Sequence, residues 1–186
     1  MSQKISDQLY LLKITLRYSD PPIWRRLVVP ATIRLYKLHK GIQVAMGWWD
    51  SHLHQFVING REYGDPSIAE WGEVLNERRY KLKNVAPRKG SKFMYEYDFG
   101  DGWQHDIVVE KILPNESGSK YLMCLDGRRA CPPEDVGGIP GYEEFLQAIN
   151  DPEHEEHESY LEWIGGEFDA ERFDIDRVNK IFSRLR

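Results

Sequence analysis

The chain has 186 residues and a mass of 21.9 kDa, which fits one domain of ordinary size. Apolar residues make up 41% of it and charged residues 30%, a balance that excludes a membrane-spanning or a disordered chain. The formal net charge of −5 conceals a split, because residues 1–97 carry 16 basic and 9 acidic side chains whereas residues 98–186 carry 9 and 21. This distribution excludes a uniformly basic nucleic-acid binder.

The N-terminal residues 1–7 are polar and lack the apolar core of a signal peptide. No window approaches 18 uninterrupted apolar residues. The two cysteines, Cys124 and Cys131, are too few for a secreted disulfide framework. We therefore expect a cytoplasmic protein with reduced thiols and no membrane association, and the sequence does not determine whether it forms a homo-oligomer.

The first third of the chain shows the order strand, strand, helix, strand. Alternating apolar residues predict strands at 9–16 and 23–29, joined as a hairpin by a Pro-Pro turn. Apolar residues with helical spacing then predict a helix that ends at Gly47, and alternation returns at 53–59. This β-β-α-β order is typical of a β-grasp-like start, although other α+β sheets share it.

The middle of the chain contains the clearest hairpin. Alternation at 92–99 and at 103–113 surrounds a Gly-Asp-Gly turn. A short helix is predicted at 68–75, a short strand at 80–85 and a further strand at 121–125.

The last third is predicted to be helical after a loop rich in proline and glycine at 126–141, and a loop of that length is usually functional or specially packed. One helix begins near Tyr142 and ends at an Asp-Pro pair, a second covers 153–164, and Asp174 caps a third. We predict one α+β domain over residues 1–186, with a mixed, mostly antiparallel sheet packed by the first helix and the C-terminal helices.

Histidines and cysteines supply candidate metal ligands. His52 and His54 are two apart on a predicted strand and so share a face, and His105 lies on a later strand. With Cys124 and Cys131 they offer five ligands that zinc or another divalent metal accepts, although the spacing of the cysteines matches no zinc finger. The alternative is structural, because buried histidines usually form hydrogen bonds with carboxylates or backbone carbonyls.

Two aspartates flank the turn of the clearest hairpin. The Asp-Phe-Gly string at Asp98 does not indicate a kinase, because no glycine-rich phosphate loop and no catalytic-loop signature accompany it. The side chains of Asp98 and Asp101 either bind turn amides or point into a cleft with His105.

Basic side chains gather beside tryptophans in the N-terminal half, where Arg25 and Arg26 follow Trp24. Basic side chains with aromatic neighbours can bind single-stranded nucleic acid through phosphate contacts and base stacking, so nucleic acid is a candidate partner. Two alternatives remain: a solvated helix face over core tryptophans, or a basic half that meets the acidic half within the fold or between subunits. The sequence contains no Gly-x-Ser-x-Gly elbow, phosphate loop or dinucleotide fingerprint.

Four sequence blocks together resemble the plasmid ORF-3-like family, named for a reading frame on an Ri-type plasmid. The blocks are PIWRR at 22–26, AMGW with SHLHQF at 45–56, YEYDFGDGWQH at 95–105, and CPPEDVGG with GY at 131–142. The resemblance implies a single α+β domain, and some members are labelled passenger proteins of insertion elements. It supplies no catalytic residues. Relatives often carry a third cysteine where this chain has Val136, a departure that weakens a cysteine-based metal site.

From these observations we predict a non-enzymatic binding or accessory module, which the resemblance links to plasmid or mobile-element biology. Its cleft is expected to include the loop at 131–141, with arginines for anion contacts, and to be lined by Trp24, Arg25, Arg26, His52, His54, Asp98, Asp101, Trp103 and His105. The alternative is a metal-dependent hydrolase or nuclease in which His52, His54 and His105 bind the metal and Asp101 activates water.

Overall fold

The computed structural model describes residues 8–68, 73–116, 118 and 122–184. Its centre is an eight-stranded sheet in the order β5-β4-β3-β6-β7-β1-β2-β8, in which only the β4–β5 pair is parallel. The strands are β1 (Gln8–Leu16), β2 (Trp24–Pro30), β3 (His54–Ile58), β4 (Arg61–Gly64), β5 (Val74–Asn76), β6 (Lys92–Tyr97), β7 (Trp103–Pro114) and β8 (Met123–Arg128).

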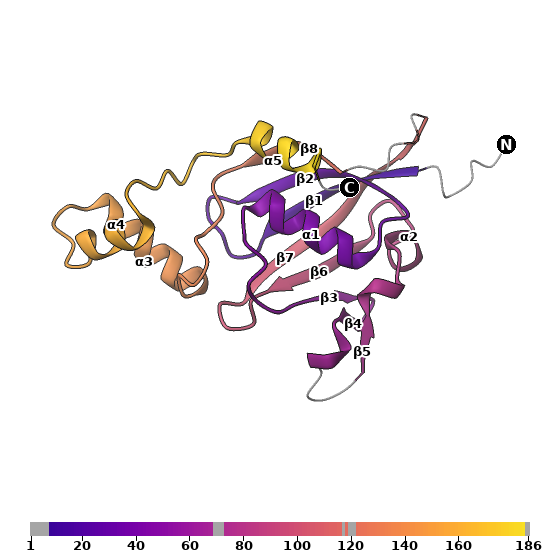
Figure 1. The fold of residues 1–186 in the computed structure, drawn as a ribbon, viewed down its shortest axis with the longest axis horizontal. Coiled ribbons are helices and arrows are strands. Elements are labelled where there is room, and N and C mark those ends of the chain that lie inside the picture. Colours follow the sequence, from indigo (N-terminus) through magenta and orange to yellow (C-terminus); the bar gives the residue numbers. More distant parts are fainter. Residues whose placement is uncertain (1–7, 69–72, 117, 119–121, 185–186) are drawn as a thin grey trace.

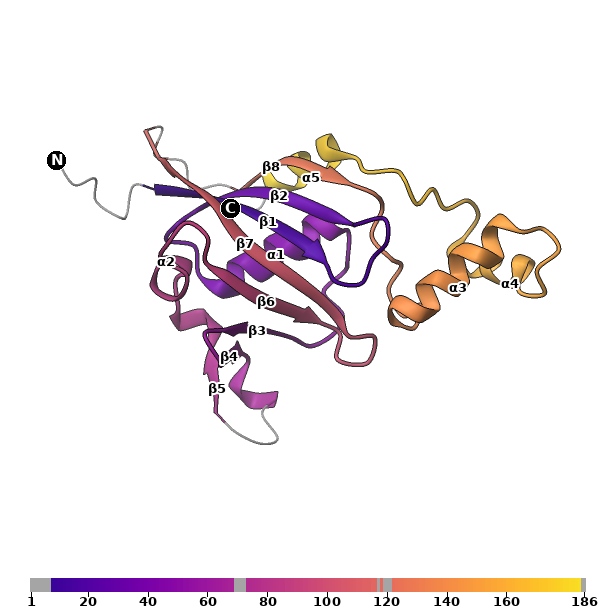
Figure 2. The ribbon, with the colours of Figure 1, turned by 180° about the vertical axis from the view of Figure 1, so that it is seen from behind.

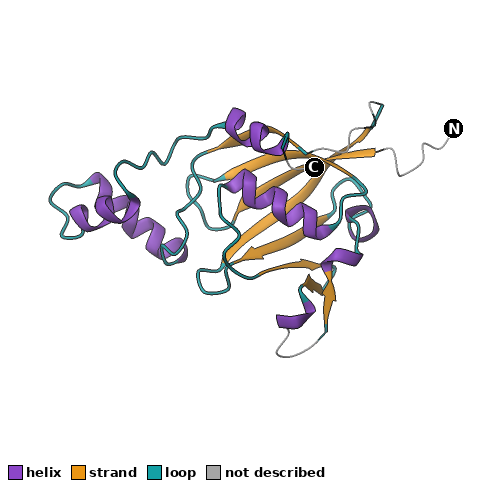
Figure 3. Cartoon of the chain, in the orientation of Figure 1, coloured by secondary structure: helices purple, strands orange, loops and turns teal. Residues whose placement is uncertain are grey.

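The helices lie on one face of this sheet and beyond one of its ends (Figure 1). Helices α1 and α5 cross the sheet face, whereas α3 and α4 form a pair that projects away from the strands (Figure 3). Two 3₁₀ turns, Pro66–Ile68 and Glu77–Arg79, lie near the β5 edge. The α-helices are α1 (Leu35–Met46), α2 (Leu82–Val85), α3 (Gly138–Asn150), α4 (His157–Ile164) and α5 (Ile175–Phe182).

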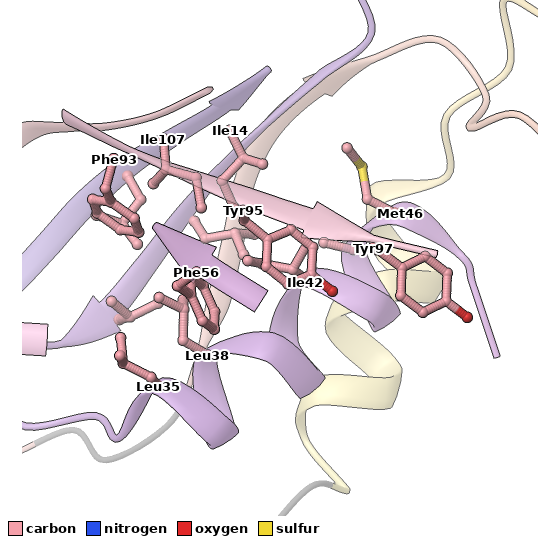
Figure 4. Close-up of a cluster of buried hydrophobic side chains, with 14 of the residues drawn as sticks. Ile14, Leu35, Leu38, Ile42, Met46, Phe56, Phe93, Tyr95, Tyr97 and Ile107 are labelled. Atoms are coloured by element: carbon pink, nitrogen blue, oxygen red, sulfur yellow. The ribbon is translucent and has the colours of Figure 1, made fainter. Parts of the chain in front are cut away.

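Helix α1 is held on the sheet by an apolar stripe that follows the helical period. Leu35, Leu38 and Ile42 are fully buried on this stripe and face strand residues such as Phe56 and Tyr95 (Figure 4). Burying one such aliphatic side chain contributes about 1.5–3 kcal/mol. The helix ends as predicted at a glycine, Gly47, whose φ of 97° is unfavourable for other residues and whose N–H donates to the Gln43 carbonyl.

No helix of the described chain covers the opposite face of the sheet (Figure 2). Basic residues of the first half meet acidic residues of the second half there: Arg17 pairs with Asp106 at 2.7 Å, and Arg26 pairs with Glu110 at 2.8 Å and Asp126 at 3.4 Å. Each of these solvated pairs contributes at most about 1 kcal/mol. Part of the charge split in the sequence is therefore neutralised within the fold.

The structure confirms the α+β class and the expected β-β-α-β order, and it places β6 and β7 between the first hairpin and β3. The predicted strand at 80–85 is wrong, because this segment forms the helical turn α2 and only Lys81 bridges to a strand partner, Arg34. Leu82 and Val85 are three residues apart, so both reach the core from one helical turn.

Two further segments differ from the sequence prediction in extent. The helix predicted at 68–75 falls partly on 69–72, which lie outside the described residues, and its last part belongs to β5. The long loop predicted at 126–141 is shorter, because β8 continues through Arg128 and α3 begins at Gly138.

The α3–α4 pair has its own aromatic cluster around Phe145, whose side chain is fully buried. The Phe145 ring centroid lies 5.2 Å from Phe168, 5.5 Å from Tyr160 and 5.9 Å from Trp163. Perpendicular arrangements of this kind stabilise aromatic pairs beyond their area burial. These ring contacts therefore hold α3, α4 and the following segment together.

We predict that Phe145→Ala lowers the free energy of unfolding by about 3–5 kcal/mol, because it leaves a cavity inside this cluster. Urea denaturation followed by tryptophan fluorescence measures the change. Trp163→Ala is the matched control, because its side chain is 48% exposed and its loss costs less. Equal effects of the two substitutions would contradict the assigned role of Phe145.

Candidate functional site

Three loops meet at one end of the sheet, and we call this region the loop junction. It comprises residues 48–53 after α1, 98–102 between β6 and β7, and 132–137 before α3 (Figure 1). Direct hydrogen bonds join the loops: the Trp48 indole N–H donates to the Pro132 carbonyl at 3.0 Å, and the Gly137 N–H donates to Asp101 Oδ2 at 3.2 Å. Segments distant in the sequence are thus fixed against one another.

Aspartates give these loops their shape. Asp98 has a φ of 56° and Asp135 a φ of 61°, a left-handed conformation that aspartate tolerates better than most residues. Asp98 Oδ1 accepts hydrogen bonds from the Gly100 and Asp101 N–H groups at 3.0 and 3.4 Å. The turn-binding role that the sequence allowed for Asp98 is therefore present, and its second oxygen, Oδ2, faces His52.

The His52 ring lies between two carboxylates. Its Nδ1 is 3.6 Å from Asp98 Oδ2, and its Nε2 is 3.1 Å from Asp135 Oδ1. One donor atom from each of His52, Asp98 and Asp135 can be chosen so that all lie within 4.8 Å of one another. The His52 side chain is 29% exposed and Asp135 is 70% exposed, so the group is open to solvent on the Asp135 side. Sequence reasoning did not single out Asp135.

The Tyr97 hydroxyl links two loops of the junction through hydrogen bonds. Its hydroxyl donates to Glu134 Oε1 at 2.5 Å and accepts from the backbone N–H groups of Ser51 at 2.9 Å and His52 at 3.3 Å. Burial, and secondarily the hydrogen bond to Glu134, raise the pKa of Tyr97, so the hydroxyl keeps its proton. Glu134 also accepts from the Trp49 N–H at 3.1 Å, which ties the loop after α1 to the loop before α3.

His54 does not join His52, because β3 begins at His54 and His52 lies in the loop before it. The His54 ring instead stacks on His39 of α1, with centroids 3.4 Å apart and planes within 1°. Its Nε2 is 3.0 Å from Glu77 Oε2. The predicted pairing of the two histidines on one strand face is therefore not formed.

His39 belongs to a buried hydrogen-bond chain that sequence reasoning missed. Gln43 donates to the Tyr95 hydroxyl at 2.9 Å, that hydroxyl lies 2.9 Å from His39 Nδ1, and His39 Nε2 lies 2.6 Å from Asp50 Oδ1. Burial, with the neighbouring His54 and Lys40, lowers the pKa of His39 to about 2, so the ring is neutral. The sequence does carry a signal for the burial of His39: it lies four residues after Leu35, on the same face of the predicted helix.

These hydrogen bonds show whether His39, Asp50 and His54 form a metal site or a structural network. Donor atoms of His39, Asp50 and His54 also lie within 4.8 Å of one another. However, both ring nitrogens of His39 are occupied, one by Tyr95 and one by Asp50, and Asp50 is further bound by Lys40. We therefore interpret this group as a satisfied core network that fixes α1 on the sheet.

His105 is fully buried among aromatic side chains and is not exposed at the loop junction. The centroid of its ring lies 5.4 Å from that of Trp48, with the two planes nearly perpendicular, and 5.5 Å from that of Tyr95. Neither ring nitrogen makes a hydrogen bond of normal geometry. Burial lowers the pKa of His105 to about 3, and the backbone carbonyls of Tyr95 and Trp103 oppose this only in part. Trp103 is equally buried, so neither residue lines an open cleft.

The two cysteines are free thiols, and neither belongs to a group of possible metal ligands among the described residues. The backbone of Cys124 in β8 exchanges two hydrogen bonds with the Asn179 side chain of α5, at 2.8 and 2.9 Å. Burial raises the pKa of Cys124 to about 11 and raises that of Cys131 further, so both stay protonated. A thiol proton of this kind disfavours metal binding.

The arginines of the predicted cleft separate onto the two faces of the sheet. Arg26 lies on the open face, paired with Glu110 and stacked 4.8 Å from the Trp24 ring. Arg25 points to the other face and is buried under α1. The single cleft expected from the sequence is therefore divided between the open face, the loop junction and the interior.

An eight-stranded, mostly antiparallel sheet with two helices on one face and a helical pair beyond its end defines this protein as an α+β protein. The chain belongs to the plasmid pRiA4b ORF-3-like family, whose model matches residues 8–177. The resemblance seen in the sequence blocks is thereby confirmed. No helix among the described residues is both long enough and apolar enough to cross a membrane.

Two relatives show how far the similarity extends. The chain is 44% identical over 177 residues to the "Uncharacterized protein y4hQ" of Sinorhizobium fredii (strain NBRC 101917 / NGR234), covering 94% of this chain and 90% of that protein. It is 38% identical to the crystal structure of the "Protein of Unknown Function MM3350" from Methanosarcina mazei Go1, with a TM-score of 0.84 over 94% of this chain and 98% of that one. Both proteins are described without an activity.

We predict that His105→Leu leaves stability at pH 7 within about 1 kcal/mol of the wild type, because it removes buried nitrogens that have no hydrogen-bond partner of normal geometry. In acid the variant should be the more stable protein. Below pH 6.5 the unfolded chain protonates His105 while the native ring stays neutral down to about pH 3, so the wild type loses stability as the pH falls through this window.

The difference should grow by up to about 1.4 kcal/mol per pH unit across that window, measured by urea denaturation at several pH values. His154→Leu is the control, because His154 lies outside the core cluster. Parallel pH profiles for wild type and His105→Leu would contradict the assignment of a neutral native ring.

Proposed function

We propose that the protein is a non-enzymatic binding module and that the loop junction is its site for a divalent metal ion of the zinc class. One observation carries the proposal: His52, Asp98 and Asp135 come from three separate loops, and their donor atoms lie within 4.8 Å of one another at a solvent-open position. Imidazole nitrogen and carboxylate oxygen are both zinc ligands.

The distances suit this chemistry. Ligand atoms bound to one tetrahedral zinc at about 2 Å lie about 3.3 Å apart, and His52 Nε2 lies 3.1 Å from Asp135 Oδ1. Asp98 faces the other ring nitrogen, and two backbone amides fix its carboxylate. A carboxylate behind a metal-binding histidine orients the ring and increases its basicity. His52 and Asp135 would therefore bind the ion, and Asp98 would position His52.

The surroundings favour a binding role over a buried structural one. Within the loop junction, the Trp49 side chain is 83% exposed and the Phe99 side chain is also exposed. Exposed aromatic side chains at a polar site are typical of a surface that meets a partner. The family takes its description from a plasmid reading frame, which supports an accessory role in plasmid or mobile-element biology.

We predict that the protein, purified without chelator and without a histidine tag, binds about one equivalent of Zn²⁺. His52→Ala should weaken binding at least tenfold and Asp98→Asn about tenfold, because the first removes a ligand and the second removes the group that orients it. Elemental analysis and titration calorimetry measure stoichiometry and affinity.

His154→Ala provides the matched control, because it removes a histidine from the turn before α4 and should leave affinity unchanged. A metal content below about a tenth of an equivalent after zinc is added back would refute the proposal. So would zinc binding that survives His52→Ala.

A metal-dependent hydrolase is the second candidate, favoured by one observation. With only His52 and Asp135 as protein ligands, coordination positions would remain for water, as in catalytic zinc sites. However, Asp101, the expected base, uses its Oδ2 to hold the Gly137 N–H. We expect no hydrolysis of bis(p-nitrophenyl) phosphate beyond the rate with Zn²⁺ or Mn²⁺ alone. Turnover that requires His52 would favour the hydrolase instead.

A further inference from the structure

A cavity of about 780 Å³ lies on the helix-covered side of the sheet. Its walls come from the end of α1 with Trp48 and Trp49, from the segment 167–174, and from α5. This volume is within the range of small-molecule sites in proteins. None of the three metal-ligand candidates of the loop junction lines it, so this cavity is separate from the proposed metal site.

One wall of the cavity holds a buried positive charge. Arg25 is only 1% exposed, and no carboxylate of the described residues forms an ion pair with it. Its Nε donates to the Ala45 carbonyl at 2.8 Å, and its Nη1 donates to the carbonyls of Trp24 and Arg128, each at 2.8 Å. No hydrogen bond within the described chain uses its remaining nitrogen, Nη2. Because a guanidinium keeps its charge in proteins, the wall lacks an anion.

Part of this arrangement is structural. Ala45 lies in the last turn of α1, where backbone carbonyls are unpaired and a cation is favourable, so Arg25 stabilises the end of the helix. That role uses Nε only. Carbonyl dipoles satisfy hydrogen-bond donors without supplying a negative charge, so the role does not explain why a full charge is buried beside open space.

The cavity also offers an apolar surface for the body of a ligand. The Phe173 ring stacks on Arg25, with the guanidinium carbon 3.9 Å from the ring centroid. Gly127 permits this stack, because a Cβ there would lie 2.4 Å from Phe173 Cε1 and 2.9 Å from Arg25 Cδ. Trp48 and Phe168 extend the aromatic lining.

The rim adds two arginines that are free of ion pairs among the described residues, Arg172 and Arg177. Of the three carboxylates in the lining, Asp169 accepts the Glu171 N–H and Asp174 accepts the Arg177 N–H as the cap of α5. The third, Glu167, forms no ion pair among the described residues, and neither do the two arginine side chains at the entrance.

We propose that this cavity binds a small organic anion, in which a carboxylate meets Arg25 and a flat apolar body lies against Phe173 and Trp48. The carboxylate supplies the charge that the wall lacks, and a charge-assisted hydrogen bond to Nη2 sets its orientation. The stacked ring and the indole provide the apolar contact that a simple inorganic anion would not use. This site functions independently of any metal at the loop junction.

The test uses 1-naphthoate as the probe. Two matched ligands each lack one feature: 1-naphthamide has the aromatic body without the charge, and acetate has the carboxylate without the aromatic body. Trp48 and Trp49 line the cavity, so tryptophan fluorescence reports binding, and titration calorimetry confirms the stoichiometry. We expect naphthoate to bind at least about tenfold more tightly than either matched ligand. Equal affinity for the amide, or no binding of naphthoate up to about 5 mM, would overturn the proposal.

Variants locate the site. Arg25→Gln should weaken naphthoate binding at least about tenfold. Because Arg25 also stabilises α1 and its replacement can impair folding, Ile181→Trp is the second variant: it keeps every charge and fills the cavity from α5. It should abolish binding while thermal unfolding remains cooperative. Arg61→Gln, at an exposed position of β4, is the charge control. Naphthoate binding that persists in folded Ile181→Trp would show that the ligand lies elsewhere.

Discussion

The position of the Trp48 indole is the constraint on which both candidate sites depend. The ring centroid lies 5.0 Å from that of Tyr97, 5.9 Å from that of Trp103 and 5.4 Å from that of His105. Its N–H holds the Pro132 carbonyl of the loop that leads into α3. Because Trp48 directly follows the glycine that ends α1, one side chain fixes the helix, the end of the sheet and the distant loop together. Trp48 belongs to the loop junction and also lines the cavity.

Polar groups inside the core add the specificity that apolar packing lacks. The chain of hydrogen bonds from Gln43 through Tyr95 and His39 to Asp50 links α1 to β6 and to the loop after α1. A fully satisfied buried network allows fewer alternative packings than an apolar surface does. His105 breaks this rule, since its nitrogens have no partners of normal geometry, and the fold retains it at a cost that increases in acid.

The charge asymmetry of the chain has two outcomes. On the open face, Arg17 and Arg26 find acidic partners from the second half, which weakens the case for nucleic-acid contacts through Arg26. Arg25, in contrast, has no acidic partner among the described residues. Consecutive strand residues point to opposite faces of the sheet, so the Arg25 side chain lies under α1. Two adjacent arginines with the same apparent role in the sequence therefore have different environments and different partners: carboxylates for Arg26 and backbone carbonyls for Arg25.

Local patterns determined most of the secondary structure. Alternation predicted the hairpins β1–β2 and β6–β7, helical spacing predicted α1, and Asp174 caps α5 as expected through a 2.8 Å bond from the Arg177 N–H. These features depend on residues close in sequence, so the sequence alone was sufficient. Four blocks also identified the family correctly. The segment at 80–85 was misassigned because a short apolar run fits either a strand or one helical turn.

The grouping of the functional residues was decided by the tertiary structure alone. His52 and His54 share a face only if both are in a strand, but β3 begins at His54, so the two rings go to different partners. Asp135 meets His52 only because Trp48 and Glu134 hold the loop before α3 against the sheet. The charge, the strands and the family follow from local chemistry, whereas the distances between donor atoms depend on long-range packing that no sequence spacing records.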